Sequence, residues 1–402
     1  MVSNYQLNRR TLLKGLGGAL GLSALGPILA GGLNSAGCAS ECEEKDLILP
    51  NSVPGTLCGI GEPLAWWQGN VNLEKVFSIE SQLGVKRHRD WINLGITLDD
   101  PYTPNPEKKQ WIDNIINTAE NHGVEIMALD DGTFAKWLTG MDNPYSVPAW
   151  GTKSYNTFLE RYRDSWATLS RTFPKLKLFE VNNEPNHLAY KHLDTSNVFE
   201  RVLLFTDMLN YARQGIKGEN PDARVIMGGL CSRGDSVAFL EEIYRCIKGE
   251  GKFADFRRYA NSPNPDDYFD IAAWHPYIRE EPGYCSFVKP NIDLHDVMDR
   301  NGDGAKPVFL TEYGFTEGDG LSPSTIAAYL EKSFKICTGN LPFIETLFWF
   351  RLFTDETSFC AEHPRECSFG IAHSPESSKP YILKLAAHTY STLSKHSTVS
   401  ME

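Results

Sequence analysis

The sequence lacks several features that would define a function directly. No glycine-rich GxGxxG loop follows an apolar run, although this loop is the signature of nicotinamide and flavin binding. There is no CxxC pair, and no group of cysteine and histidine residues has the spacing of a zinc site. Basic residues are also scarce, since 51 acidic residues outnumber 39 basic ones. The sequence therefore predicts a protein that uses neither a cofactor nor a structural metal ion.

The net charge of −12 argues against two classes of partner. Nucleic acids and anionic membranes are bound through basic patches, whereas an acidic surface suits a neutral substrate. Beyond the N-terminal segment, no apolar stretch is long enough to span a bilayer. We therefore expect no nucleic acid partner and no membrane span. The sequence does not determine the oligomeric state.

Residues 1–37 are predicted to be an export signal. Asn8 to Gly15 reads NRRTLLKG and places two arginines before a glycine-rich apolar run, Leu16 to Leu33. This order resembles a twin-arginine signal, and the segment is left out of the fold. An amphipathic N-terminal helix is the alternative, but here the charges precede the apolar run instead of alternating with it. We expect export to the periplasm, the outer surface or the medium.

Nine cysteines raise two further questions. Ser35 to Cys38, SAGC, partly resembles a lipoprotein cleavage box, although Ser35 stands where such a box usually has leucine. A lipid anchor on Cys38 would leave an even number of cysteines. Cys360 and Cys367 flank a short loop and are a candidate disulfide in an exported protein, with two free thiols as the alternative.

The remaining chain reads as a leader followed by one domain. Residues 38–54 form a polar leader, and residues 55–398 form a single domain because no serine and glycine linker interrupts them. Within this domain a short apolar run, a polar turn and an amphipathic stretch follow one another repeatedly. The apolar runs predict eight strands, namely Thr56 to Gly61, Val85 to Trp91, Glu125 to Leu129, Leu176 to Val181, Arg224 to Gly228, Ile271 to Trp274, Val308 to Thr311 and Leu347 to Phe350.

Helical patterns lie between these strands. Strands that alternate with helices form βαβ units and a parallel sheet. Eight such units predict a (β/α)8 TIM barrel, a fold that takes about 250 residues before insertions. A doubly wound open sheet is the alternative, but its phosphate-binding loop is missing. The helical patterns include Lys109 to His122, Asn156 to Phe173, Val198 to Gly218, Val237 to Ile247, Ser324 to Cys337 and Pro380 to Ser394.

Polar residues gather where the predicted strands end. In such a barrel the active site forms at the carboxyl ends of the strands, so these residues are the candidates for function. They are Arg89, Asp130, Asp131, Asn182, Asn183, Glu184, His275, Tyr277, Glu312, Tyr313, Trp349 and Arg351.

Two of these candidates are glutamates on strands that face each other across the barrel. Glu184 follows the fourth strand and Glu312 the seventh. Glycoside hydrolysis uses such a pair, because one carboxyl group protonates the leaving oxygen while the other attacks the anomeric carbon. A separation of about 5–5.5 Å would give retention of configuration. Arg89 is a candidate for keeping one of the two carboxylates ionised.

These motifs resemble clan A of the retaining glycoside hydrolases. Asn183-Glu184-Pro185 ends the fourth strand, and Glu312 lies in a TEYG sequence on the seventh. The cellulase family (family 5) and the β-xylosidase family (family 39) are the most similar, and the resemblance covers about residues 55 to 395. It implies a (β/α)8 barrel, a carbohydrate substrate, and Glu184 as acid/base with Glu312 as nucleophile. Asn183 is implied to bind the sugar 2-hydroxyl.

The resemblance implies roles for other residues as well. Tyr277 is expected to hydrogen-bond the nucleophile, and His275 to lie in the substrate site. Arg89 is expected near the nucleophile, and Trp349 is expected to floor the cleavage subsite. Asp130 is a further candidate for substrate binding, with a role in a loop turn as the alternative.

Each assignment has a structural alternative. Arg87 has the same strand parity as Arg89 and could be the inward residue, which would leave Arg89 in an ion pair. Trp349 could pack in the core against a helix, because barrel strands alternate inward and outward residues. His275 could be a satisfied core histidine. The Trp66-Trp67 pair could stack on sugar units or pack beneath a loop.

Three other classes of function have sequence signatures of their own. A carbohydrate-binding barrel without catalysis would keep the aromatic residues but lose a carboxylate. Flavin and nicotinamide enzymes would show a phosphate loop, and a metal-dependent hydrolase would gather several histidines and aspartates at strand ends. The leading interpretation is an exported, retaining β-glycoside hydrolase. The sequence determines neither the sugar and its linkage nor endo or exo action.

Overall fold

The computed structural model describes residues 42–187, 193, 195, 197–232, 235–256, 259–354 and 364–395. The expected export signal and Cys38 lie outside these residues, as does Cys360. Export, lipidation and the pairing of Cys360 with Cys367 therefore stay predictions, although Cys367 itself is disulfide-bonded.

All eight expected strands are present, with small shifts at their ends. They form one parallel sheet in the order β7-β6-β5-β2-β1-β11-β10-β9-β8. Two short pairs, β3 with β4 and β12 with β13, lie outside it. The described strands are β1 (Cys58–Gly61), β2 (Arg87–Asp90), β3 (Leu98–Asp100), β4 (Thr103–Pro104), β5 (Glu125–Asp130), β6 (Leu178–Val181), β7 (Arg224–Met227), β8 (Leu230–Cys231), β9 (Ala272–His275), β10 (Val308–Tyr313), β11 (Ile344–Phe350), β12 (Phe353–Thr354) and β13 (Ala372–His373).

The two ends of this sheet meet. Only Gly228 and Gly229 separate β7 from β8 in the chain, and β8 pairs with β9. Ile226 of β7 forms a parallel bridge with Ile271, and the Met227 amide donates to the Ile271 carbonyl over 2.9 Å. The ring of strands is therefore closed, which confirms the barrel and excludes the open, doubly wound sheet.

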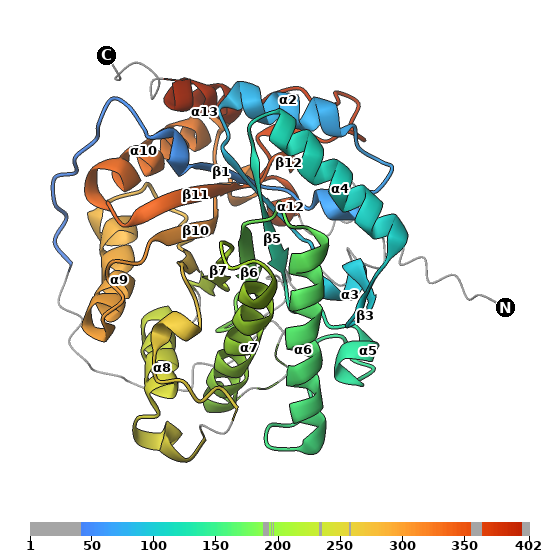
Figure 1. Ribbon diagram of the computed structural model, residues 1–402. Helices are drawn as coiled ribbons and strands as arrows, with labels where there is room; N and C mark the ends of the chain where they lie inside the picture. The colour runs from blue at the N-terminus through green and yellow to red at the C-terminus, as the bar shows by residue number, and fades with distance from the viewer. Residues whose placement is uncertain are drawn as a thin grey trace.

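Helices surround the strands on the outside (Figure 1). All six expected helices are present, and α2 and α9 follow β1 and β9 in the same way. The described α-helices are α2 (Leu73–Leu83), α3 (Leu94–Thr97), α4 (Pro106–Asn121), α5 (Lys136–Thr139), α6 (Lys153–Thr172), α7 (Val198–Glu219), α8 (Ser236–Lys248), α9 (Lys289–Asn301), α10 (Pro323–Asn340), α12 (Pro364–Cys367) and α13 (Leu385–Lys395).

Local sequence sets where these helices begin. The Asn105 side chain accepts a hydrogen bond from the Lys108 amide, and Pro106 occupies the first turn of α4. Asparagine caps one of the unpaired amides, and proline loses nothing there because its missing N–H would have no partner. Helix α4 therefore starts three residues before the apolar periodicity predicts.

The strands are buried on both faces, which explains their nearly continuous apolar sequence. Inside the barrel, one cluster fills the lumen, and a larger cluster packs between strands and helices. Each fully buried apolar side chain contributes about 1.5–3 kcal/mol. The lumen cluster consists of Met127, Leu178, Ile226, Ile271, Ala273, Phe309 and Phe348.

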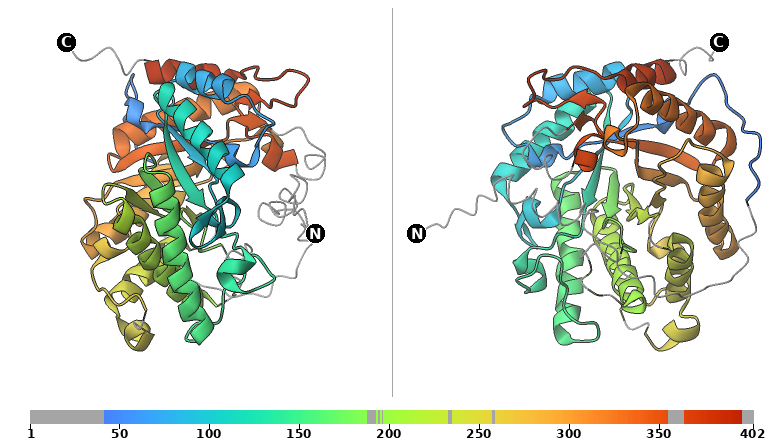
Figure 2. Two further views of the ribbon diagram at one scale, coloured as in Figure 1. Left: turned by 45° about the vertical axis from the view of Figure 1, so that its right-hand side comes forward. Right: turned by 180° about the vertical axis from the view of Figure 1, so that it is seen from behind.

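Both ends of the described chain are tied to the barrel. The Tyr390 hydroxyl donates to the Gly59 carbonyl over 2.9 Å, so the last helix lies beside the first strands. Figure 2 shows α13 next to α2. At the other end, a disulfide joins Cys42 to Cys285, in the segment between β9 and α9. Among the described residues, no helix has the length and apolar character needed to cross a membrane.

Candidate active site

The turn after β6 carries Glu184 in an unusual backbone conformation. Asn182 and Glu184 both have positive φ angles, 72° and 47°. Residues other than glycine seldom adopt such angles, and those that do cluster at functional sites. The Asn182 side chain accepts from the Asn183 amide at 2.8 Å, and the Glu184 amide donates to the Gly229 carbonyl at 3.0 Å. These bonds fix the turn over the junction of β7 and β8.

This close approach requires two glycines. A Cβ atom on Gly228 would lie 2.5 Å from the Asn182 carbonyl oxygen. A Cβ atom on Gly229 would lie 2.1 Å from Nε2 of His275. The Gly228-Gly229 pair thus lets the β6 turn and the end of β9 approach β7 and β8 closely.

Arg89 binds three site residues from the centre of the barrel. Its guanidinium donates to Glu312 at 2.6 Å, to Glu180 at 2.5 Å and to the side-chain oxygen of Asn183 at 2.8 Å. Arg89 is fully buried. Burial alone would lower its pKa, but the Glu180 and Glu312 carboxylates raise it above its usual value. Arg89 is therefore a permanent cation beside Glu312, as expected.

The alternative for Arg89 is only partly correct. Arg87 also points into the barrel but lies nearer its opposite end, where it pairs with Glu125 and Glu345. Arg89 does form an ion pair, yet one of its partners is the candidate nucleophile, Glu312.

Glu180 is a further site residue that the strand-end pattern did not predict. Its carboxylate binds Arg89, the Thr311 hydroxyl at 2.8 Å and the Gly229 amide at 3.1 Å. The sequence offered one indication of this role. Glu180 is a charged residue inside a predicted buried strand, and such residues are rarely buried without a partner.

Tyr277 and His275 complete the surroundings of the two glutamates. The Tyr277 hydroxyl donates to Glu312 at 3.2 Å. Burial, together with the negative charge of Glu312, raises the pKa of Tyr277 well above its usual value, so the hydroxyl keeps its proton. His275 lies 2.9 Å from Glu184 through Nδ1 and 3.0 Å from the Thr311 hydroxyl through Nε2.

The two candidate catalytic carboxyl groups face each other. Side-chain oxygens of Glu184 and Glu312 and a ring nitrogen of His275 all lie within 4.8 Å of one another. So close an approach is compatible with direct attack by one carboxylate, the geometry in which the carboxyl groups lie about 5–5.5 Å apart. Both glutamate side chains retain slight exposure, 8% for Glu184 and 9% for Glu312, so the pair is accessible.

Trp349 does not lie in the site, and its expected role as a subsite floor is wrong. It is fully buried in the cluster between strands and helices, where its ring contacts Tyr313 and Phe315. Strand parity explains the result. Phe348 points into the lumen, Trp349 points to the helices, and Phe350 points inward again.

Phe350 takes the place expected for Trp349. It belongs to a cluster with Trp91 and Phe369, against which Tyr277 packs. The Arg89 guanidinium lies 4.8 Å from the centre of the Trp91 ring. These aromatic side chains therefore border the polar site, and counting inward positions on β11 from Phe348 would have found Phe350.

The structure also corrects the expected role of Asp130. Its carboxylate is 1% exposed, and it accepts hydrogen bonds from the Leu94 amide and the Tyr162 hydroxyl. Asp130 therefore holds the loop after β2 and does not face a substrate. The neighbouring Asp131 carboxylate accepts a hydrogen bond at 2.9 Å from the side-chain amide of Asn93.

The two tryptophans after β1, Trp66 and Trp67, lie in different environments. Trp67 is 5% exposed and packs against Phe353, so its role is structural. Trp66 is partly exposed and packs edge-on against Trp91, next to the site.

The closed barrel carries the two paired carboxyl groups at the carboxyl ends of its strands. The chain has the fold of clan A glycoside hydrolases, as its motifs suggested. No protein-family model matches the sequence, and neither does any curated protein.

Solved structures with this fold include three glycoside hydrolases of low sequence identity. A family 39 glycoside hydrolase from the gut symbiont Bacteroides cellulosilyticus WH2 has a TM-score of 0.62 and 16% identity, over 86% of this chain and 64% of that chain. A family 39 β-xylosidase from Caulobacter crescentus has a TM-score of 0.58 and 14% identity, over 85% and 72%. A family 1 β-glucosidase from Thermotoga maritima has a TM-score of 0.54 and 13% identity, over 88% and 100%. The chain thus spans less than two thirds of the Bacteroides protein.

Proposed function

We propose that the protein is an exported, retaining β-glycoside hydrolase, with Glu312 as nucleophile and Glu184 as acid/base. The observation that carries this proposal is the approach of the two carboxyl groups, each with its own partners. Arg89 and Tyr277 both donate to Glu312, whereas His275 lies against Glu184. Two carboxyl groups in different environments can divide the roles of nucleophile and acid.

The reaction has two steps. Glu312 attacks the anomeric carbon while Glu184 gives its proton to the leaving oxygen, so the glycosidic bond breaks and an ester to Glu312 forms. Glu184 then removes a proton from water, and the resulting oxygen nucleophile attacks the anomeric carbon and releases Glu312. Two displacements on the same carbon give net retention.

The remaining polar residues would position these groups. Arg89 supplies a positive charge beside Glu312 before attack and after release. Its bond to Asn183 orients the asparagine, whose side-chain amide is then directed to bind the sugar 2-hydroxyl. Phe350 and Trp91 offer apolar surface to a sugar ring.

The β-xylosidase, β-glucosidase and exo-β-1,4-mannosidase among the structures with this fold act on β-linked sugars, as their names state. We propose a β-linked oligosaccharide or polysaccharide as substrate for this chain. The second candidate is a carbohydrate-binding barrel without catalysis, for which the aromatic border of the site is the supporting observation.

A panel of aryl β-glycosides and β-glycans tests both candidates. The wild type is assayed beside Glu184→Gln and Glu312→Gln, with Glu345→Gln as a control. Glu345 pairs with Arg87 and Arg224 away from the site, so its loss should spare catalysis. We expect Glu312→Gln to lose all activity. Glu184→Gln should lose about 10²–10⁴-fold on substrates with poor leaving groups and much less on activated aryl glycosides.

Rescue by azide tests whether Glu312 is the nucleophile. Azide should restore turnover to Glu312→Ala and yield a glycosyl azide of inverted configuration, since it takes the place of the missing nucleophile. Binding of glycans by the wild type without cleavage of any of them would favour the carbohydrate-binding barrel.

A further inference from the structure

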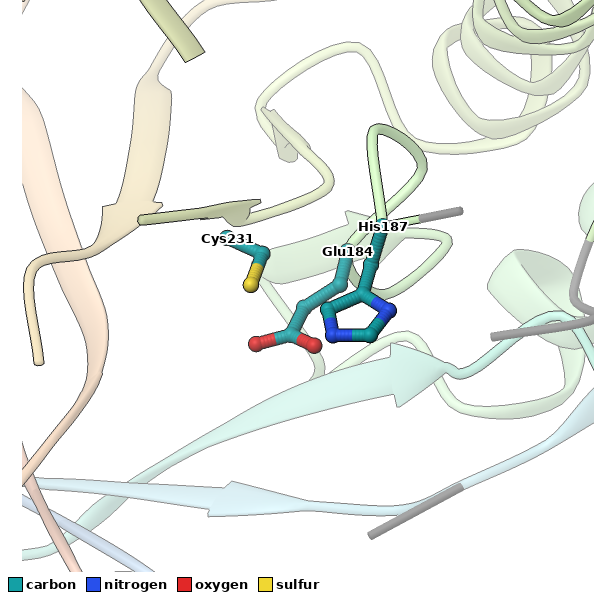
Figure 3. A group of neighbouring side chains, drawn as sticks. All are labelled: Glu184, His187 and Cys231. Carbon is teal, nitrogen blue, oxygen red and sulfur yellow. The ribbon is translucent and has the colours of Figure 1, made fainter. Parts of the chain in front are cut away.

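We propose that Glu184, His187 and Cys231 form a binding site for a thiophilic divalent metal ion of the zinc class. We further propose that the ion inhibits the enzyme by occupying Glu184, a consequence that rests on the proposed function. One ligand atom from each side chain lies within 4.8 Å of those of the other two. Figure 3 shows the Cys231 sulfur and the His187 ring directed toward the Glu184 carboxylate.

The three donors are those that zinc selects. Zinc binds thiolate sulfur at about 2.3 Å and imidazole nitrogen and carboxylate oxygen at about 2.0–2.2 Å, usually in tetrahedral geometry. Two ligands of one tetrahedral ion therefore lie about 3.4–3.6 Å apart. Movements of about 1 Å bring donors within 4.8 Å to that spacing. A sulfur donor also selects zinc over magnesium and calcium, which prefer oxygen.

The backbone holds the three residues together in the absence of a metal ion. The His187 amide donates to the Glu184 carbonyl at 2.9 Å, which forms a tight turn after β6. The Asn186 side chain in this turn bonds both the amide and the carbonyl of Cys231, each at 2.8 Å. The turn and β8 are thus clamped to each other, and ligands fixed in this way need little reorganisation on binding.

The burial of the three side chains suits an exchangeable ion rather than a structural one. Cys231 and Glu184 are buried, whereas His187 is partly exposed and marks the route from solvent. Three protein ligands leave a fourth position for water, as in accessible zinc sites. The ion would be taken up from solution and would hold the Glu184 carboxylate away from its role as proton donor.

A competing set of donors shares Glu184. It consists of Glu184, His275 and Glu312, whose ligand atoms also lie within 4.8 Å of one another. It contains no sulfur donor. A thiophilic ion should therefore prefer the set with Cys231, and substitution of Cys231 separates the two possibilities.

The test uses metal binding and activity in parallel. Co²⁺ is titrated into the wild-type protein and into the variants Cys231→Ser and Cys246→Ser, and the near-ultraviolet absorption of a cobalt–thiolate bond is recorded. Cys246 is a buried cysteine on α8, away from Glu184, and serves as the matched control. Zn²⁺ affinity follows from competition with Co²⁺, and hydrolysis is measured with and without Zn²⁺ in each variant.

We expect the thiolate band in the wild type and in Cys246→Ser but not in Cys231→Ser. Zinc affinity and zinc inhibition should fall at least about 10–100-fold in Cys231→Ser, since even residues that only orient a ligand have effects of this size. His187→Gln should weaken both as well. The absence of a thiolate band in the wild type, or equal zinc inhibition of wild type and Cys231→Ser, would overturn the proposal.

The two readouts also separate this proposal from the proposed function. A protein that binds cobalt through Cys231 but cleaves no glycoside would support the metal site and contradict the hydrolase. A protein that cleaves glycosides without forming the thiolate band would support the hydrolase and contradict the metal site.

Discussion

The guanidinium of Arg89 donates to the Glu312 carboxylate over 2.6 Å from a position where no solvent reaches it. The same guanidinium binds Glu180 at 2.5 Å, so one cation holds two buried carboxylates. Removing one partner of a buried ion pair lowers stability far more than replacing the whole pair with apolar residues. The remaining charge then stays buried without compensation.

We predict that Arg89→Lys folds but loses about 100-fold in kcat. Lysine keeps the charge but cannot reproduce the fork that reaches both carboxylates, and a misplacement of about 1 Å can have this effect. Arg89→Met should lower the free energy of unfolding by about 3–5 kcal/mol. Steady-state kinetics and urea unfolding measure the two effects.

Arg87→Lys is the matched control. Arg87 also points into the barrel and also pairs with two carboxylates, Glu125 and Glu345, but it lies away from the site. This variant should change stability without changing kcat. Equal kinetic losses in the two lysine variants would show that Arg89 acts only through stability.

We predict that substitution of Trp349 affects stability, whereas substitution of its neighbour Phe350 affects substrate binding. Trp349→Phe should lower the free energy of unfolding by about 1–3 kcal/mol and leave KM unchanged, because Trp349 packs against the helices. Phe350→Ala should raise KM by about tenfold, equivalent to about 1.4 kcal/mol, because Phe350 borders the site. A rise in KM for Trp349→Phe would contradict the inward and outward assignment.

We predict a pH-dependent stability difference between the wild type and Asp130→Asn. Burial, and to a lesser extent the negative charge of Asp131, raises the pKa of Asp130 from 3.8 to about 8. Between these pH values the native carboxyl group keeps a proton that the unfolded chain releases. Its contribution to stability is therefore complete below about pH 4 and is lost as the pH rises toward about 8.

Asparagine resembles the protonated carboxyl group and still accepts from the Leu94 amide. Asp130→Asn should therefore gain stability relative to the wild type by up to about 1.4 kcal/mol per pH unit across this window. Urea unfolding at pH values from 4.5 to 8 measures the difference. The exposed Asp222→Asn variant is the control, and a constant difference between wild type and Asp130→Asn would refute the prediction.

We predict that the Cys42–Cys285 disulfide stabilises the fold. It joins residues separated by 243 positions, and the Glu44 carboxylate beside it accepts from the Tyr284 amide at 3.0 Å. The double variant Cys42→Ser/Cys285→Ser should lose about 2–5 kcal/mol of unfolding free energy. The difference from the wild type should vanish in reductant, and a difference that persists there would point to packing instead of the covalent bond.

Several properties could be predicted from the sequence because they depend on short-range patterns. Alternating apolar runs and amphipathic stretches predicted the eight strands and their helices, since each element must bury one face. The position of Glu184 and Glu312 directly after strands predicted that they would meet, because parallel strands in a barrel end on the same side. Arg89, His275 and Tyr277 were found for the same reason.

Other properties depended on side-chain direction and on distant pairing. Trp349 and Phe350 differ by one position, and only the register of β11 decided which of them faces the site. Asp130 lies at the end of a strand, as the two candidate catalytic glutamates do, yet its carboxylate accepts a hydrogen bond from the Leu94 amide.

The sequence by itself therefore determined the barrel and the identity of the two carboxyl groups, because both follow from periodicity and from strand ends. Only the tertiary structure decided which groups surround them. Glu180 joins Arg89, and Cys231 approaches Glu184 and His187, although these residues lie on separate strands and turns. Such contacts arise from the closure of the ring of strands, which brings residues that are far apart in the chain within a few ångströms of one another.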